Sequence, residues 1–233
     1  ASIIASTPAE KRPPHIWFEV SLLMGFTAFE RMKMSRSKLV YTALAAIAII
    51  GAFFAFAPSG GVTGGLSEAT RTELVALQTD DMKKLVIHPE PQALASAPYT
   101  LAEGGTETLD AHEGKVILLN FWATWCAPCR KEMPMLAELQ EELGGPDFEV
   151  ITLATGRNDP AAMARFFDEI GVTNLPLHTD ANSAVARQMG VLGLPATVLI
   201  ARDGTEVARL LGDADWASDS AKDILKTLIA SNE

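Results

Sequence analysis

The most apolar stretch of the chain is a run of 19 residues, from Leu39 to Ala57, without a charge, Asn, Gln or Pro. A helix of this length would span roughly 28 Å, which is close to the hydrocarbon core of a bilayer. A buried core helix is the alternative, but such helices seldom lack a polar face over this length. We therefore expect one transmembrane helix over residues 39–57.

Basic residues flank this apolar run on its N-terminal side only. Four Lys and Arg residues stand between positions 31 and 38, whereas no Lys or Arg follows the run before Arg71. The positive-inside rule therefore predicts that residues 1–38 form a cytoplasmic stub. The chain after Pro58 is then expected outside the cytoplasm.

Two features of this N-terminal part leave alternatives open. Ala55-Phe56-Ala57 has the small-x-small form of a signal-peptidase site, so the apolar run could be a cleaved signal peptide. Pro58 would follow the cut and is expected to block the peptidase, which favours an uncleaved anchor. Met34 is an alternative start, after which a short basic segment and the apolar run form an ordinary signal anchor.

Residues 58–98 read as a linker followed by a helical extension. The segment from Pro58 to Gly65 is rich in glycine, which is typical of a flexible linker. Leu66 to Val86 has the apolar spacing of a helix, and the proline-rich sequence HPEPQ over 88–92 is expected to end it.

Strand and helix patterns alternate from residue 99, which predicts one α/β domain over residues 99–233. Residues 99–109 predict an N-terminal β-hairpin around Gly104-Gly105, and the apolar run 116–122 predicts a strand buried on both faces. Further strands are predicted over 148–154, 196–201 and 206–211. One helix is predicted to end at residue 143, a second to begin at residue 160, a third to cover 183–189 and a fourth to close the chain. This order predicts a mixed central sheet with helices on both faces.

Charge divides the chain in the same place as hydropathy does. The net charge of −10 separates into +3 for residues 1–60 and −13 for residues 61–233. An acidic external domain argues against binding of nucleic acid, which needs a basic face. The chain has two cysteines, too few for a disulfide-rich scaffold or a four-thiolate zinc site.

The two cysteines, Cys126 and Cys129, have two residues between them and stand where the buried strand gives way to a helix. The four histidines lie at no metal-ligand spacing, and Arg130 occupies the position where covalent haem attachment needs His. A purely structural disulfide is the remaining alternative. It would close so short a loop that it would restrain the unfolded chain little. The pattern therefore favours a redox-active pair and no metal site.

The start of a helix suits a reactive thiol. Its free backbone N–H groups and its dipole stabilise an anion, so we expect them to lower the pKa of the Cys126 thiol. Cys126 is then the exposed nucleophile, and Cys129, one turn inside, is the more buried resolving thiol. Pro128 fits the first turn, because an N–H is dispensable there. Trp125 is expected beside the sulfur, and Trp122 in the core.

The sequence FWATWCAPCRKEMP, from Phe121 to Pro134, resembles the active-site motif of the thioredoxin superfamily. Together with GLPATVLI from Gly193, it is similar to the membrane-tethered TlpA/ResA branch. The resemblance covers about Leu66 to the C-terminus and implies a thioredoxin-like fold. It also implies dithiol–disulfide exchange, for which no cofactor is needed.

The resemblance draws attention to a carboxyl group near the cysteines. Thioredoxins carry a buried Asp in the strand where this chain has Asn120, whereas ResA-type reductases place a Glu where this chain has Glu132. Glu132 is i+3 from Cys129, so the two lie on nearly one helix face. A partly buried Glu132 could relay the proton of the resolving thiol. A solvent-facing Glu is the alternative.

A second matched feature is the dipeptide Leu194-Pro195. In thioredoxin folds this Pro is cis and faces the cysteines, and the residue before it offers backbone hydrogen bonds to an extended substrate. A Pro that merely opens a strand is the alternative. The predicted catalytic residues are therefore Cys126, Cys129 and Glu132. The predicted substrate-binding residues are Trp125, Ala127, Pro128, Leu194 and Pro195.

The resemblance further implies a setting and partners. We expect a monomeric reductase in the bacterial periplasm, anchored in the inner membrane and kept reduced by a thiol carrier of the DsbD/CcdA type. Its clients would be apocytochrome c or copper-site assembly proteins of cytochrome oxidase. The alternatives are a general disulfide oxidase or isomerase, a copper-binding assembly protein, and a thiol peroxidase. A peroxidase needs Thr at the position of Ala123.

Overall fold

The computed structural model describes residues 64–231. The stub and the transmembrane helix predicted over residues 1–57 lie outside these residues. Within residues 64–231, no helix is both long and apolar enough to cross a bilayer.

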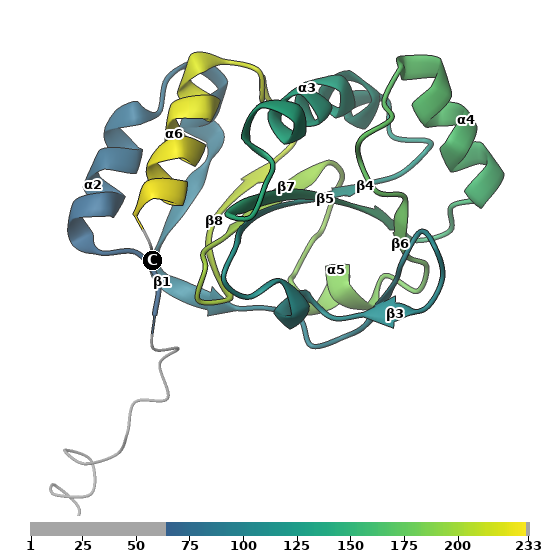
Figure 1. The fold of residues 1–233 in the computed structure, drawn as a ribbon, viewed down its shortest axis with the longest axis horizontal. Helices are drawn as coiled ribbons and strands as arrows, with labels where there is room; N and C mark the ends of the chain where they lie inside the picture. The colour runs from purple at the N-terminus through teal and green to yellow at the C-terminus, as the bar shows by residue number, and fades with distance from the viewer. Residues whose placement is uncertain (1–63, 232–233) are drawn as a thin grey trace, which may run out of the picture. The chain divides into compact units, whose positions relative to one another are not determined.

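One sheet of eight strands forms the centre of the fold, in the order β1-β8-β7-β4-β5-β6-β2-β3 (Figure 1). The central strand β4 pairs in parallel with β5 and antiparallel with β7, so the sheet is mixed, as predicted. All seven residues of β4 are buried, because strands cover both of its edges and helices cover both of its faces. The strand bounds are β1 Val86–Ala93, β2 Tyr99–Thr100, β3 Thr106–Glu107, β4 Val116–Trp122, β5 Phe148–Thr155, β6 His178–Asp180, β7 Ala196–Ile200 and β8 Thr205–Leu211.

Helices cover both faces of this sheet. Figure 1 shows α2, α3, α4 and α6 on one side of it and α5 on the other. The α-helices are α2 Glu68–Leu77, α3 Ala127–Leu143, α4 Pro160–Ile170, α5 Ala184–Gln188 and α6 Asp219–Ala230, and two 3-10 helices are η1 Asp80–Lys84 and η2 Leu109–His112. The α/β architecture predicted from the sequence is therefore confirmed for the described residues.

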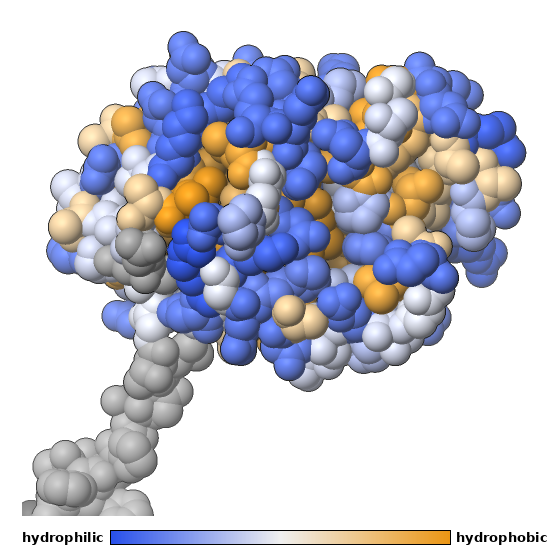
Figure 2. All heavy atoms as spheres, in the orientation of Figure 1, coloured by the Kyte–Doolittle hydropathy of each residue, from blue (hydrophilic) through white to orange (hydrophobic). Residues whose placement is uncertain are grey.

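The side chains of β4 alternate between two apolar cores. Leu118 and Trp122 pack with α3, α4 and α6, whereas Leu119 and Phe121 pack on the opposite face with α5. This follows from the period of two along a strand, which sends successive side chains to opposite faces. Polar side chains cover most of the face drawn in Figure 2, as the acidic composition of this domain requires.

The segment before residue 99 differs from its prediction. The helix expected from Leu66 to Val86 ends as α2 at Leu77, and η1 follows it. The proline-rich segment then forms β1, which pairs antiparallel with β8 at the edge of the sheet. Two prolines are tolerated there because an edge strand needs ladder N–H groups on one side only. The predicted hairpin is confirmed, since β2 and β3 pair Tyr99 with Glu107.

Candidate active site

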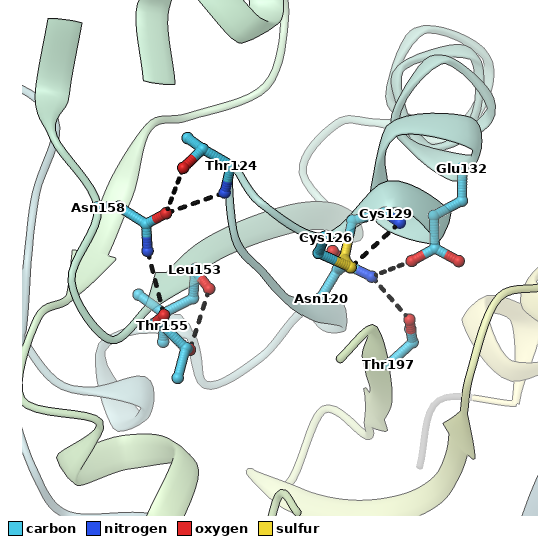
Figure 3. The surroundings of a disulfide bond; sticks show 9 residues. All are labelled: Asn120, Thr124, Cys126, Cys129, Glu132, Leu153, Thr155, Asn158 and Thr197. Carbon is cyan, nitrogen blue, oxygen red and sulfur yellow. Dashed lines mark hydrogen bonds between the residues drawn. A yellow bond between two sulfur atoms is a disulfide. The ribbon is translucent and has the colours of Figure 1, made fainter. Parts of the chain in front are cut away.

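Cys126 and Cys129 are joined by a disulfide at the start of α3, directly after β4 and its short connecting loop (Figure 3). Cys126 is the N-cap residue of α3, and its Sγ accepts a hydrogen bond from the backbone N–H of Cys129 at 3.3 Å. A thiolate at this sulfur would face the same N–H and the positive end of the helix dipole. The helix start is therefore built to stabilise a thiolate at position 126.

The predicted burial of Cys129 is confirmed, whereas the predicted exposure of Cys126 is wrong, because the surrounding fold buries this residue. Cys129 is fully buried, as expected for a resolving thiol, but Cys126 is only 4% exposed rather than openly accessible. Trp125, the residue before Cys126, is 70% exposed. Ala127 is exposed and Pro128 is half-buried in the first helical turn.

The core side of the loop is held by aromatic packing. Trp122 is fully buried, and its ring centroid lies 5.0 Å from that of Phe166 and 5.2 Å from that of Phe167. Its predicted place in the core is therefore confirmed.

The guanidinium of Arg130 lies 4.4 Å from the ring centroid of Phe166 and pairs with Glu169 at 3.1 Å. Its positive charge is thus engaged on the α4 side of the site.

A side chain that the sequence did not single out fixes the loop before the cysteines. Asn158 accepts hydrogen bonds from the backbone N–H of Thr124 at 2.9 Å and from its hydroxyl at 3.2 Å (Figure 3). Asn158 follows β5, whose carboxyl end lies beside that of β4 because the two strands are parallel. That shared edge is the signal by which a polar residue after β5 could have been assigned to the site.

Glu132 lies in the interior rather than in solvent. Its side chain is fully buried, and its Oε1 accepts a hydrogen bond from Asn120 Nδ2 at 2.7 Å (Figure 3). Burial raises the pKa of Glu132 to about 7, an effect that the Asn120 hydrogen bond and the donors of Ala214 and Trp216 only partly offset. The carboxyl therefore takes up and releases a proton near neutral pH. The solvent-facing alternative is wrong.

Leu194-Pro195 is a cis peptide, as the resemblance implied. The next residue, Ala196, opens β7 and pairs with Phe121 of β4. This register places Pro195 at the carboxyl end of β4, where the loop to the cysteines begins. Pro195 is buried and Leu194 is half-buried, whereas Leu192 is 95% exposed. The structure thus brings both matched motifs to one end of the sheet.

Two further buried residues act on the Asn120–Glu132 pair, Thr197 through Asn120 and Trp216 through Glu132. Thr197 on β7 accepts the second hydrogen bond from Asn120 Nδ2, at 2.9 Å, and Trp216 lies on the segment between β8 and α6. Thr197 had a signal in the sequence, since it is the polar residue within an otherwise apolar strand. Across residues 64–231, no group of three or more His, Cys, Asp and Glu side chains is placed to hold a metal ion.

Comparison with known proteins supplies the family. The family model described as Redoxin matches residues 91–225, more than half of the chain. The chain belongs to the redoxin family. The match runs from the last residues of β1 into α6 and includes both cysteines, Glu132 and Pro195.

Curated relatives of this redoxin include thiol-disulfide oxidoreductases. It is 35% identical to ResA of Bacillus anthracis over 48% of this chain and 63% of the relative. It is 32% identical to the thiol:disulfide interchange protein HelX of Rhodobacter capsulatus, over 51% of this chain and 60% of the relative. The chain thus spans somewhat less than two thirds of the length of these relatives. The predicted resemblance to the TlpA/ResA branch of the thioredoxin superfamily is confirmed, whereas the membrane tether stays a prediction.

Solved structures share the fold of this redoxin. A secreted thiol-disulfide isomerase of Corynebacterium glutamicum matches with a TM-score of 0.52 and 22% identity, over 66% of this chain and 95% of that one. A thiol:disulfide interchange protein of the thioredoxin family from Chlorobium tepidum matches with a TM-score of 0.51 and 21% identity, over 61% and 99%. The described domain therefore has a thioredoxin-like fold.

Proposed function

We propose that the chain is a thiol-disulfide oxidoreductase that exchanges disulfides through Cys126 and Cys129. The observation that carries this proposal is the placement of the pair. Cys126 caps α3 with its sulfur facing a backbone N–H, and Cys129 lies fully buried one turn behind it. A stabilised thiolate with a second thiol within reach is the arrangement that two-step exchange requires.

The first step is attack on a client. The Cys126 thiolate attacks one sulfur of the client disulfide, and the client S–S bond breaks as the mixed disulfide forms. The second client sulfur leaves as a thiolate and takes a proton from solvent. Exposed Trp125 and half-buried Leu194 lie at this end of the sheet and offer apolar surface to the client.

The second step releases the client. Cys129 loses its proton and attacks Sγ of Cys126, so that the mixed disulfide breaks and the remaining client sulfur leaves. Glu132 stands one helical turn beyond Cys129, and its pKa of about 7 suits acceptance of that proton. Each cycle moves two electrons to the client and leaves Cys126 and Cys129 joined.

The proposal includes a direction and a setting. The chain acts as a reductase in the periplasm, anchored by residues 39–57 in the inner membrane, and works as a monomer. Because each cycle oxidises the pair, a membrane thiol carrier of the DsbD/CcdA type must return two electrons. The clients are apocytochrome c or copper-site assembly proteins of cytochrome oxidase. This part rests on the apolar run, its basic flank and the likeness to ResA and HelX.

Trapping tests the proposal and identifies the client. Cys129→Ser removes the resolving thiol, so the full-length variant expressed in cells should accumulate mixed disulfides on Cys126. These adducts are read as reductant-sensitive bands and identified by mass spectrometry, with Cys126→Ser as the matched control. Adducts with haem-site or copper-site proteins would support the assigned clients. Equal adducts in both variants, or none in either, would contradict the exchange mechanism.

A further inference from the structure

The amide of Asn120 joins three buried polar side chains from three elements. Asn120 lies on β4, Glu132 on α3 and Thr197 on β7, and all three are fully buried. Asn120 Nδ2 donates to Glu132 Oε1 at 2.7 Å and to Thr197 Oγ1 at 2.9 Å (Figure 3). Both hydrogens of the amide are therefore engaged, one of them on the carboxyl group.

The ionised form of Glu132 requires this orientation of the amide. If the Asn120 side chain were flipped, Oδ1 would face Glu132 Oε1, and an ionised carboxylate would then meet an acceptor instead of a donor. An amide N–H has no acceptor role, so it holds Oε1 both when Glu132 is ionised and when it is protonated. Glu132 Oε2 is buried without a hydrogen-bond partner in this geometry, so it is the oxygen left for the proton.

The other groups that face Glu132 add no positive charge. The backbone N–H of Ala214 and the indole of Trp216 lower the pKa of Glu132 as neutral donors without forming a complete hydrogen bond to it, and the Asp213 carboxylate acts as a like charge. On its own helix it stands three residues after Cys129, which is joined to Cys126 and carries no charge. Neutral N–H donors alone therefore stabilise the ionised form, and Asn120 is the donor with a short, well-formed bond.

We infer that Asn120 is a positioning residue that holds Oε1 of Glu132 and thereby directs the exchangeable proton to Oε2. This inference rests on the proposed function, in which Glu132 accepts the proton of Cys129. It also gives a physical reason for an amide where thioredoxins carry Asp. A carboxylate at position 120 would lie against Glu132, and the two groups would share one proton.

The test follows the Glu132 carboxyl directly in the full chain. Infrared difference spectra against pH, with ¹³C-labelled Glu and Glu132→Gln as the blank, report its ionisation in the oxidised protein. Asn120→Ala removes a donor to the ion and should raise the Glu132 pKa by about one unit. Asn120→Asp keeps the shape of the side chain and should produce a coupled pair of carboxyl groups. The second proton of this pair should be lost at a pH further above 7 than the Glu132 proton of the wild type.

Thr197→Val is the matched control for this test. It removes the other partner of the same amide but leaves the Asn120–Glu132 bond, so the Glu132 pKa should move by less than about half a unit. If Asn120→Ala does not fold, the near-isosteric Asn120→Asp decides the outcome. An unmoved pKa in the folded Asn120 variants, or an equal shift in Thr197→Val, would overturn the inference.

Exchange measurements separate this inference from the proposed function. The pH at which the exchange rate is half-maximal should follow the Glu132 pKa from variant to variant. Wild-type exchange with an unmoved pKa in the variants would refute the role of Asn120 and leave the exchange mechanism standing. A shifted pKa in a protein that exchanges no disulfide would refute the proposed function and leave the positioning of the carboxyl standing.

Discussion

Cys126→Ser is expected to abolish disulfide exchange, with a loss of about 10⁴-fold or more in the rate. A serine hydroxyl is not ionised at neutral pH, so the attacking anion disappears. Serine is a favoured N-cap residue, and its oxygen can accept the hydrogen bond that Cys126 Sγ accepts from Cys129. The start of α3 should therefore survive. The measurement is the rate at which the reduced variant cleaves a disulfide-bonded peptide.

Reduced wild-type protein and Cys129→Ser are the controls for this loss. Cys129→Ser should still attack the peptide and stop at the mixed disulfide, because Cys126 is intact. The free energy of unfolding of reduced Cys126→Ser should match that of the reduced wild type within about 1 kcal/mol, since only a cap side chain changes. Exchange by Cys126→Ser within tenfold of the wild-type rate would make Cys129 the attacking thiol and contradict the assignment.

Glu132→Gln is expected to increase stability above neutral pH and to slow exchange. Burial raises the folded-state pKa of Glu132 to about 7. In the unfolded chain this carboxyl loses its proton near its ordinary value, so between about pH 4.5 and 7 the folded state binds more protons than the unfolded one. Stability therefore falls as pH rises through this window, by about 3 kcal/mol in total. Gln stays neutral at every pH in this window, so the free energy of unfolding of the variant does not fall there for this reason.

The stability difference between Glu132→Gln and wild type isolates this effect. Glu149, whose pKa the His112 hydrogen bond holds near 2, acts at lower pH and is present in both proteins. Urea unfolding at pH 4.5 and pH 8 should therefore give a variant advantage that grows with pH. Glu141→Gln, an exposed change on the same helix, should show no such growth. An advantage independent of pH would mean that Glu132 is not protonated in the folded protein at pH 4.5–7.

The same variant tests the proton relay. Gln at position 132 can accept the Asn120 hydrogen bond at its carbonyl oxygen, but it cannot take a proton from Cys129. Loss of a general base typically costs about 10² in rate, so resolution of the mixed disulfide should slow by about that factor. The first attack by Cys126 should change little. Unchanged resolution would exclude the relay while leaving the cysteine pair intact.

Elements with strong local signals could be predicted from the sequence. The run 116–122 is apolar at six of its seven positions because β4 is buried on both faces, and α4 shows a clear apolar stripe. β1 gave no such signal, since it is a mostly exposed edge strand that contains two prolines. β6 has only three residues, too few for any pattern to stand out.

The residues of the site also differ in whether the sequence could predict them. Spacing and helix position identified Cys126 and Cys129, and the likeness to a known family brought in Glu132 and Pro195. Asn158 and Trp216 reach the site from loops distant in sequence, which only the pairing of the strands brings together. The burial of Cys126 depends on the fold around it as well as on its position at a helix start.

The central claim is that the fold makes Cys126 a better attacking thiol than a free cysteine. The most direct measurement is the second-order rate constant at pH 7 for the reaction of reduced Cys129→Ser with a protein disulfide such as insulin. Glutathione at the same thiol concentration is the reference. If the helix start lowers the Cys126 pKa toward neutrality, the thiolate fraction and the rate should exceed those of glutathione by about tenfold. A rate equal to or below that of glutathione would contradict the account.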